Sequence, residues 1–481
     1  MAAASSNRGP TSPISCGQVA RRPVQDAFMS SLQSLRAYLA ELDASGELAH
    51  VPDEVSPHFE LSACLSVADG GKALIFDKVA GSSFRAVGNL LSNRDRIARA
   101  LKIDKDQIQR RLIEAIDGAI PPVEITGGPV QEVITTADPL AGLPVPTFFA
   151  AEAGPYITAG LIVAKDPQTG RGNASYARIL VTGPATGMIG IAPNHHLAHL
   201  ARKAASLGQK LEIAVVLGAH PAIQLAGCLY LGLGDDEMHC AGKLLGQPVE
   251  LVRCRTVDLM VPAHAEMVLE GTIDVDTPIK EGLISEYHGM YEDYGAGFLT
   301  EFRCRTHRRD ALFQVIEPGY HGEHIYLGAL PIAASLRIAL ARVFPNVGEV
   351  AVTASGAGRN DAVVQMVKPK PGQGKRAIFV CWGAVNIVKS VTVVDEDIDP
   401  WDLAAVDRAR CARMKGDRDI VIVPAVSADR SEPLEHGGLI TKIGYDATAK
   451  DGDRPEGITQ ALPPAEFLDA ARMKLRTLGI L

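Results

Sequence analysis

The sequence lacks the features that mark nucleic-acid-binding, secreted and membrane-spanning proteins. Its 481 residues carry a net charge of −8 and no cluster of Lys and Arg, which argues against a surface for DNA or RNA. The eight cysteines are scattered and form no CxxC pair, so they predict no zinc site and are typical of reduced thiols in a cytosolic protein. No apolar run reaches the roughly 18 residues of a membrane span. We therefore expect a cytoplasmic protein that binds neither nucleic acid nor membrane.

Several nucleotide and metal motifs are also absent. There is no Walker loop and no GxGxxG, so nucleotide binding of those two types has no support. The stretch His195-His196-x-x-His199 lacks the glutamate of HExxH, and the acidic run 395–399 lacks the EF-hand spacing. We interpret that run as the polar end of a strand. With 47% hydrophobic and 22% charged residues, the chain is typical of globular proteins with two or three domains.

Residues 1–28 differ from the rest of the chain. The first 25 contain three Arg, three Pro and no acid, and they lack the long apolar core of a secretory signal. A transit peptide, a disordered tail and an over-extended start all have this composition. We interpret the segment as a disordered tail outside the fold.

Hydrophobic periodicity divides the remainder into four parts. Residues 29–122 predict an N-terminal α/β segment that opens with an amphipathic helix over 31–48. Residues 123–322 are β-rich and predict a barrel-like or mixed β domain. Residues 323–462 alternate helices and strands, which favours a C-terminal α/β domain with a parallel or mixed sheet. Residues 463–481 predict a closing helix, and the overall fold class is α/β or α+β.

Individual elements follow from short apolar runs. The β-rich part predicts strands at 159–165, 177–182, 211–217, 249–255, 267–273 and 299–305, with a helix over 195–207. The C-terminal part predicts an apolar helix over 329–344 and strands at 350–353, 377–381, 390–394 and 420–424.

The stretch Glu281-Gly-Leu-Ile-Ser-Glu286 carries the first chemical signal. Two carboxylates five residues apart point about 140° apart on a helix and to opposite faces of a strand. The backbone must therefore bend to bring both to one pocket, and Gly282 permits that bend. Two acids on a bent segment beside His288 are typical of an acid/base site.

Three upstream stretches strengthen this interpretation: Asn173-Ala-Ser-Tyr-Ala-Arg178, Pro193-Asn-His-His-Leu197 and Gly234-Asp-Asp-Glu237. An amide, a histidine and a glutamate form a ligand set that a divalent ion such as Mn²⁺ or Mg²⁺ accepts. Arg178 is then free to hold a carboxylate with its planar guanidinium.

With these four stretches in order, the chain resembles the UbiD-type decarboxylases, which use prenylated FMN. The family pattern is Asn-x-x-x-x-Arg, then a His after a Pro-Gln/Asn element, then a metal-binding Glu, then Glu-Gly-x-x-x-Glu. The likeness runs from about residue 30 to residue 450. It implies a split-barrel domain over 123–322 that binds prenylated FMN, and a C-terminal α/β domain over 323–462 that mediates a homodimer or homohexamer. It also implies a small-molecule carboxylic acid as substrate and a flavin prenyltransferase that supplies the cofactor.

The resemblance also implies a role for each site residue. Glu286 is expected to donate the proton, Arg178 to hold the substrate carboxylate, and Glu281 to hold and tune them. The metal ligands are expected to be Asn173, His196 and Glu237, with Mn²⁺ or Mg²⁺ and a nearby K⁺ joining the flavin phosphate to the protein. Further cofactor contacts are expected from Thr158, Ser175, Tyr176, Ala177, His195 and Lys389.

Two positions depart from some relatives, which have Gln at the position of His195 and Met at that of Tyr287. Both are expected to line the substrate pocket, so the substrate is not inherited and aryl, heteroaryl and acrylic acids all remain open. Two other functions remain as alternatives: a non-catalytic or accessory subunit of a carboxylase complex, and a metal-dependent hydrolase that uses His196 and Glu237.

Overall fold

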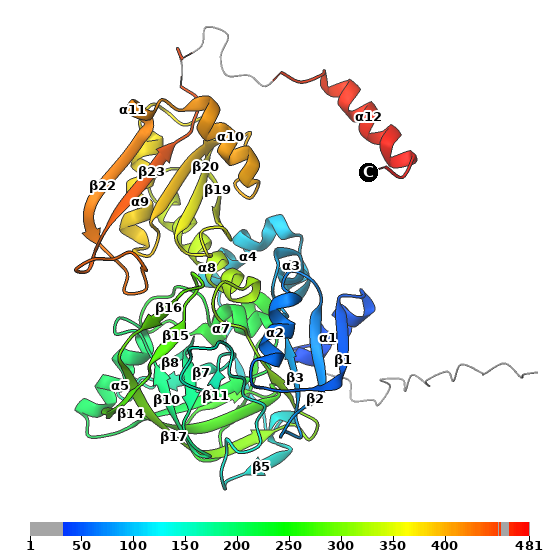
Figure 1. Cartoon of the computed structure of the whole chain (residues 1–481), viewed down its shortest axis with the longest axis vertical. Helices are drawn as coiled ribbons and strands as arrows, with labels where there is room; N and C mark the ends of the chain where they lie inside the picture. Colours follow the sequence, from blue (N-terminus) through cyan, green and yellow to red (C-terminus); the bar gives the residue numbers. More distant parts are fainter. Residues whose placement is uncertain (1–31, 451, 454–460, 481) are drawn as a thin grey trace, which may run out of the picture.

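The computed structural model describes residues 32–450, 452–453 and 461–480. The interpretation of residues 1–28 lies outside this part. The described chain forms a large body with an N-terminal α/β region beside a curled β sheet, and a C-terminal α/β region above them (Figure 1).

The N-terminal region is built around a four-stranded sheet in the order β1-β2-β3-β18. Its last strand, β18 (Leu312–Gln314), comes much later in the sequence than the other three and pairs in parallel with β3. The other elements are α1 (Leu35–Ala44), β1 (Leu48–Val55), α2 (Glu60–Val67), β2 (Ala73–Val79), β3 (Arg85–Gly88), α3 (Arg94–Leu101) and α4 (Ile108–Asp117).

The helix predicted over 31–48 is shorter in the structure. Helix α1 ends at Ala44, and Leu48 already belongs to β1. Leu35, Leu39 and Leu42 are buried, whereas Leu32 is 62% exposed before the Ser34 cap. The leucine spacing located the helix, but its ends depend on the cap and on the pairing of β1 with β2.

The middle region contains a nine-stranded antiparallel sheet, with the order β6-β9-β10-β17-β14-β11-β7-β8 and β5 paired to β17. Two long strands, β14 (Met267–Lys280) and β17 (Ala296–His307), form its centre, and their register shifts twice, next to Gly271 and before Pro278. Such irregularities bend and twist a sheet, and this one curls into a half-barrel. The remaining strands are β5 (Val133–Thr135), β6 (Tyr156–Ile157), β7 (Leu161–Lys165), β8 (Gly172–Tyr176), β9 (Arg178–Val181), β10 (Thr186–Gly190) and β11 (Leu211–Leu217).

Helices and smaller sheets surround this half-barrel. The helices are α5 (His196–Ser206), α6 (Pro221–Ala226) and α7 (Glu237–Leu245). A three-stranded sheet joins β4 (Val123–Glu124), β12 (Glu250–Arg253) and β13 (Met260–Pro262), and a hairpin joins β15 (Leu283–Ser285) and β16 (Tyr291–Asp293). The mixed α/β fold with a β-rich middle region is as the sequence predicts.

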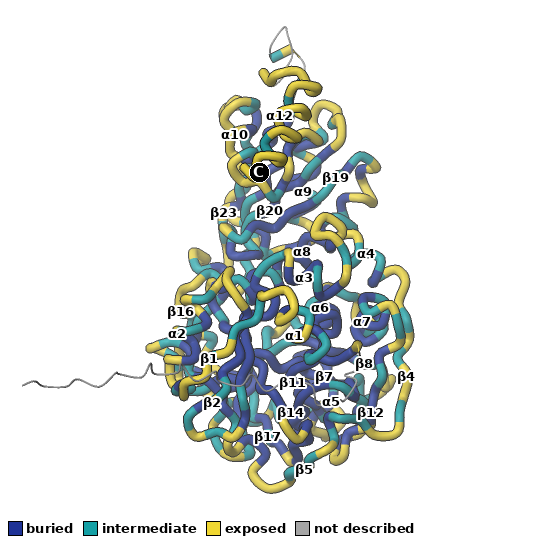
Figure 2. Tube along the Cα trace, turned by 90° about the vertical axis from the view of Figure 1, so that its right-hand side faces the viewer, coloured by how far each residue is buried: buried dark blue, intermediate teal, exposed yellow. Residues whose placement is uncertain are grey.

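The C-terminal region has a five-stranded mixed sheet in the order β19-β20-β21-β23-β22. Its elements are β19 (Val347–Val352), β20 (Asp361–Met366), α9 (Gln373–Ala384), β21 (Ser390–Asp395), α10 (Leu403–Arg413), α11 (Gly416–Asp419), β22 (Ile420–Ser427) and β23 (Leu439–Asp446). Helix α12 (Ala465–Thr477) has no buried residue (Figure 2). It lies apart from this sheet (Figure 1).

The strand predicted at 377–381 is wrong, because these residues lie in helix α9. Ala377, Ile378 and Cys381 are fully buried, and their spacing of one and four residues places them on one face of a helix. A short apolar run does not distinguish a buried strand from a buried helix by periodicity alone.

Helix α8 (Gly322–Ala341) connects the two hydrophobic cores. Leu327 and Leu330 belong to the core of the first two regions, whereas Ile332 and Leu336 belong to that of the C-terminal sheet. In the described chain only this helix is long and apolar enough to cross a membrane by length and composition, and 56% of the relevant window is buried inside the fold. It begins seven residues before the predicted 329–344 because Glu323, in its first turn, is buried against the N-terminal region.

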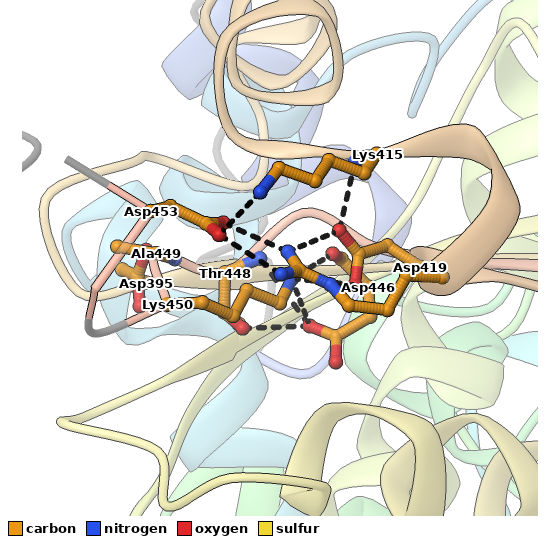
Figure 3. Close-up of polar contacts among 9 residues, drawn as sticks. Asp395, Lys415, Asp419, Asp446, Thr448, Ala449, Lys450 and Asp453 are labelled. Atoms are coloured by element: carbon orange, nitrogen blue, oxygen red, sulfur yellow. Dashed lines mark hydrogen bonds and ion pairs between the residues drawn. The ribbon is translucent and has the colours of Figure 1, made fainter.

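A polar cluster closes one end of the C-terminal sheet (Figure 3). Arg418 donates to Asp419 and Asp453 at 2.7–2.9 Å, and Lys415 donates to Asp453 at 2.8 Å. These partners hold the pKa of Asp453 well below its usual range. Charge-assisted bonds of this kind fix Asp453 beside α11.

The carboxyl of Glu323 should make stability depend on pH. It is 0% exposed, accepts from the Leu91 N–H at 3.1 Å, and burial raises its pKa to about 7. Since the folded-state pKa is the higher one, the contribution to stability is complete below the unfolded pKa of about 4.3 and is lost as pH rises towards 7. The wild-type protein should lose unfolding free energy as the pH rises from about 4.5 to about 7.5. Glu323→Gln cannot ionise, so we expect its loss over this range to be about 3 kcal/mol smaller than that of the wild type. Denaturant unfolding at several pH values measures this.

The matched control is Glu466→Gln on the exposed helix α12, which should leave the pH dependence unchanged. Burial also raises the pKa values of Glu237 and Glu317 to about 7. These two carboxyls should therefore keep part of the dependence of unfolding free energy on pH in every variant. A Glu323→Gln protein with the full wild-type slope would contradict the prediction.

Candidate active site

A buried ion pair joins two strands of the half-barrel. Arg178 begins β9 and Glu281 directly follows β14, and the guanidinium donates to both carboxylate oxygens at 2.5 and 2.6 Å. Glu281 is 2% exposed. Burial alone would lower the pKa of Arg178, but the hydrogen bonds and charge of Glu281 outweigh it, and the pKa is raised. Arg178 is therefore a fixed cation.

The chain bends between the two acids as the sequence predicts. Gly282 has a φ of +86°, a conformation that favours glycine, and the chain then enters hairpin β15–β16. Glu286 lies in the turn of this hairpin, where its N–H donates to the Met290 carbonyl at 3.0 Å. The bend places Glu281 behind Arg178 and Glu286 at the cavity in front of it.

The main cavity has a volume of about 380 Å³ and lies where the half-barrel meets α8. Six predicted site residues line it: Thr158, Tyr176, Ala177, Arg178, His195 and Glu286. Burial, and then the charge of His196, lower the pKa of His195, so its imidazole is neutral near pH 7. The fold thus brings the proposed acid and the proposed carboxylate clamp to one cavity.

A smaller cavity of about 170 Å³ contains two of the three predicted metal ligands. Asn173 and His196 line it, together with Asp166 and Arg171. Glu237 begins α7 and is 4% exposed beside Asn173. Its carboxylate accepts from the Ala174 N–H at 2.7 Å and from the Asn173 amide at 3.2 Å.

The residues of this smaller site fit a hard cation. Asn173 Oδ1 is buried and has no hydrogen-bond partner within the described chain. Burial, with added repulsion from Asp236 and Asp235, raises the pKa of Glu237 to about 7. A divalent ion would satisfy the amide oxygen and favour the ionised carboxylate. No group of three His, Cys, Asp or Glu suited to a metal occurs among the described residues, so the amide oxygen is essential to this ligand set.

Several polar atoms in or beside the main cavity also have no partner within the described chain. They are Ser175 Oγ, Tyr176 OH, His195 Nδ1 and Arg359 Nη1. Buried polar groups are nearly always hydrogen-bonded. Their presence around one cavity fits a ligand with many polar atoms, as a flavin is.

The structure places two of the predicted pocket or cofactor residues outside the main cavity. Lys389 lines neither cavity, and its Nζ pairs with Glu432 at 2.8 Å, so its contact with a flavin phosphate stays a prediction. Tyr287 does not line the main cavity. It is 2% exposed, and its hydroxyl lies 3.0 Å from Asn360 Oδ1 and 3.3 Å from the Ser431 carbonyl oxygen, because the turn directs it towards the C-terminal region.

Sequence reasoning missed two ionisable residues that line the cavity, His324 and Arg359. His324 lies in the first turn of α8, and burial lowers its pKa to about 3. Arg359 lies between β19 and β20. Neither belongs to a recognisable motif, and only the approach of the C-terminal region to the half-barrel brings them to the cavity.

Comparisons with known proteins agree with this architecture. Consecutive parts of the chain match the three domains of the 3-octaprenyl-4-hydroxybenzoate carboxy-lyase (UbiD) family. The matches are the N-terminal domain over residues 39–116, the Rift-related domain over 123–321 and the C-terminal domain over 325–447. An anhydromevalonate phosphate decarboxylase of Methanothermobacter thermautotrophicus is 35% identical over 410 residues, covering 85% of this chain and 96% of the relative. The chain therefore belongs to the UbiD family.

Solved structures define the class further. The UbiD-class enzyme HmfF from Pelotomaculum thermopropionicum, in complex with FMN, aligns with a TM-score of 0.87 at 36% identity over 91% of this chain and 99% of its own. An evolved dimeric form of HmfF in complex with prFMN aligns with a TM-score of 0.83, also at 36% identity, over 90% and 98%. The chain is thus a decarboxylase of the UbiD class, which sets aside the accessory-subunit and hydrolase alternatives. Its own oligomeric state stays a prediction.

The Arg178–Glu281 pair should be strongly coupled in stability. Glu281→Gln keeps the shape but removes the charge opposite a mostly buried guanidinium, and breaking a buried pair costs about 3–5 kcal/mol. Because Arg178 also faces the cavity, we expect a loss near the lower limit. Denaturant unfolding of Glu281→Gln, Arg178→Met and the double variant gives the coupling energy. Additive losses in the double variant would show that the pair contributes no coupling.

Proposed function

We propose that this protein catalyses the reversible non-oxidative decarboxylation of an aromatic, heteroaromatic or α,β-unsaturated carboxylic acid, with prenylated FMN and a divalent cation. The observation that carries the proposal is that a fixed Arg178 and the carboxyl of Glu286 line one cavity, with Glu281 behind the arginine. Loss of CO₂ from an sp² carbon needs an electron sink that no side chain offers, and prenylated FMN supplies that chemistry when bound.

In this proposal Arg178 orients the substrate carboxylate. A guanidinium held by Glu281 on one side presents its remaining N–H groups to the cavity without reorganisation. The low solvent exposure of this pair strengthens the interaction with an anionic substrate. Glu281 acts as a positioning residue, because both of its oxygens are already occupied by Arg178.

Glu286 is proposed to return a proton to the carbon that loses CO₂. Its carboxylate accepts from the Tyr287 N–H at 3.2 Å, which fixes the side chain near the cavity. Burial, and then the charge of Glu286, raise the pKa of the adjacent Tyr294, so the phenol holds its proton more tightly than usual. Glu286 lines the cavity whereas Tyr294 does not, which favours Glu286 as the group that exchanges a proton.

The metal and flavin contacts are proposed for the residues of the smaller cavity and its surroundings. Asn173, His196 and Glu237 would hold Mn²⁺ or Mg²⁺, with K⁺ nearby, and the ions would balance the phosphate charge of the flavin. Thr158, Ser175, Tyr176, Ala177 and His195 would contact the cofactor. Lys389 would reach the phosphate if it leaves Glu432.

The function is tested by co-expression with a flavin prenyltransferase. We expect a protein with bound prenylated FMN, identified by its absorbance spectrum and the mass of the released cofactor. This protein should release CO₂ from a panel of benzoic, furoic, pyrrole-2-carboxylic and cinnamic acids and their ring-substituted derivatives. A fully loaded protein that neither decarboxylates nor exchanges labelled CO₂ with any acid in the panel would contradict the proposal.

Cofactor retention should depend on Glu237. Glu237→Ala removes one cation ligand and leaves the phosphate charge unbalanced, so we expect metal and flavin content after purification to fall at least tenfold. Metal analysis and flavin absorbance measure both. Glu466→Ala, the same substitution at an exposed position on helix α12, is the control and should purify loaded. A loaded Glu237→Ala protein would overturn the assignment.

Proton donation should depend on Glu286. Glu286→Gln cannot donate near neutral pH, and general acid catalysis is worth about 10² to 10⁴ in rate. We expect a turnover loss in this range with unchanged fold, metal content and flavin spectrum. Glu292→Gln in the same hairpin is the control and should retain activity. Near wild-type decarboxylation by Glu286→Gln would exclude this role.

A further inference from the structure

The carboxyl of Glu317 is buried, but only one of its oxygens is bonded. Glu317 lies beyond the end of β18 and is 1% exposed. Its Oε1 accepts hydrogen bonds from two hydroxyls of α2, that of Ser62 at 3.0 Å and that of Ser66. Its Oε2 makes no hydrogen bond within the described chain. Since buried polar atoms are nearly always hydrogen-bonded, packing against α2 accounts for one oxygen and leaves the other to be explained.

His321 and Asp69 continue from this oxygen to the surface. The Nε2 atom of His321 lies 3.4 Å from Glu317 Oε2 and 3.5 Å from Asp69 Oδ1. The imidazole is 4% exposed, whereas the Asp69 side chain is 32% exposed. The Gly322 N–H, at the start of α8, donates to both Asp69 oxygens at 3.2 and 3.0 Å and fixes this carboxylate. One ring nitrogen thus faces an inner and an outer carboxylate, so it can take up a proton on one side and release it on the other.

A second cavity, which we call the outer cavity, joins these groups to the hairpin that carries Glu286. It has a volume of about 280 Å³ and is lined by Asp69, Glu317 and His321 on one side and by Gly289, Met290 and Tyr291 of the hairpin on the other. Such a polar space has room for several water molecules. Ser285 and Pro318 line both the outer and the main cavity.

Ser285 is the polar residue of this shared wall. It directly precedes Glu286, and its N–H donates to Glu152 at 3.3 Å. Its hydroxyl makes no hydrogen bond with another described residue. A hydroxyl both donates and accepts, so that of Ser285 can link water in the outer cavity to the carboxyl of Glu286.

The charges around Glu317 suit proton transfer near neutral pH. The carboxyl faces Asp69 beyond α2, Glu152 of the loop before β6, and His321. Burial, with smaller contributions from the charges of Asp69 and Glu152, raises the pKa of Glu317 to about 7. Burial lowers the pKa of His321, so the imidazole does not retain a proton against Glu317. A group with a pKa near the working pH gives up and regains a proton at similar cost.

The proposed reaction consumes one proton in each turnover. The C–COO⁻ bond breaks and CO₂ leaves, while a C–H bond forms with the proton of Glu286, which is left as a carboxylate. Glu286 has to regain a proton before the next turnover. The main cavity is the proposed binding place of substrate and cofactor, so a route from the other side of the hairpin can reload Glu286 while that cavity is occupied.

We propose that Glu317 and His321 form a proton-transfer route from solvent to Glu286, through water in the outer cavity and the hydroxyl of Ser285. This inference rests on the proposed function. In each cycle Glu317 releases its proton towards Glu286 and regains one from solvent through His321, while Asp69 holds the imidazole at the surface end. No charge accumulates along the route, because every proton that reaches Glu286 is replaced from solvent.

Two measurements on protein loaded with prenylated FMN separate the route from the rest of the chemistry. Their substrate is the acid of the panel above that the wild-type protein decarboxylates fastest. Exchange of labelled CO₂ with this acid breaks and re-forms the C–COO⁻ bond and consumes no proton, whereas net decarboxylation consumes one. We expect Glu317→Gln to slow net turnover about 10²-fold, the lower limit for a positioned acid or base, and to leave CO₂ exchange unchanged.

Two further variants distinguish a route from a packing role. Ser62→Ala removes a hydrogen bond to the bonded oxygen of Glu317 and leaves Oε2 and His321 in place, so it should keep both rates. His321→Ala should slow net turnover without slowing exchange, and added imidazole should restore part of the turnover by occupying the vacated space. A turnover that imidazole does not raise would exclude His321 from the route.

The remaining outcomes separate this inference from the proposed function. Equal slowing of turnover and exchange in Glu317→Gln, or no slowing of either, would overturn the route and retain the function of the active wild-type protein. Slowing of turnover by Ser62→Ala to the level of Glu317→Gln would do the same. Loaded wild-type protein that neither decarboxylates nor exchanges CO₂ with any acid of the panel would reject the function, and the route with it.

Discussion

The bidentate ion pair between Arg178 and Glu281 is the interaction on which the site depends. It joins residues 103 positions apart, one at the start of β9 and the other just beyond β14. The two meet only because the antiparallel sheet curls, with register shifts beside Gly271 and Pro278. The pair removes a carboxylate from solvent and holds a guanidinium rigid at the cavity. Removing these charges from water costs folding free energy. In return the guanidinium is already oriented for an anionic ligand before that ligand binds.

Helix α8 determines where the cavity ends. Its two faces contribute to both hydrophobic cores, so the C-terminal sheet cannot shift without disturbing the packing of the half-barrel. His324, Leu327 and Gly328 of this helix line the cavity opposite Arg178. The cavity is thus an interface between regions, as is common for small-molecule sites. It is lined by motif residues from the half-barrel side and by residues outside any motif from the C-terminal side.

Polar groups without partners indicate what the protein has yet to bind. Around the proposed cofactor site they are two hydroxyls, an imidazole nitrogen and an amide oxygen. Such neutral groups, gathered at two neighbouring cavities, suit a flavin and a cation.

The sequence by itself determined the features that depend on local pattern. The leucine spacing of α1, the runs of β11 and β21, and the bend at Gly282 follow from side-chain periodicity and backbone freedom, and the four motifs indicated the family. Periodicity failed at 377–381, since a five-residue apolar run fits a strand or a helix, and packing of α9 on the C-terminal sheet decided for the helix. Only the tertiary structure placed Tyr287 away from the cavity and brought His324 and Arg359 into it, because these contacts join segments far apart in sequence, whose meeting depends on how the cores pack.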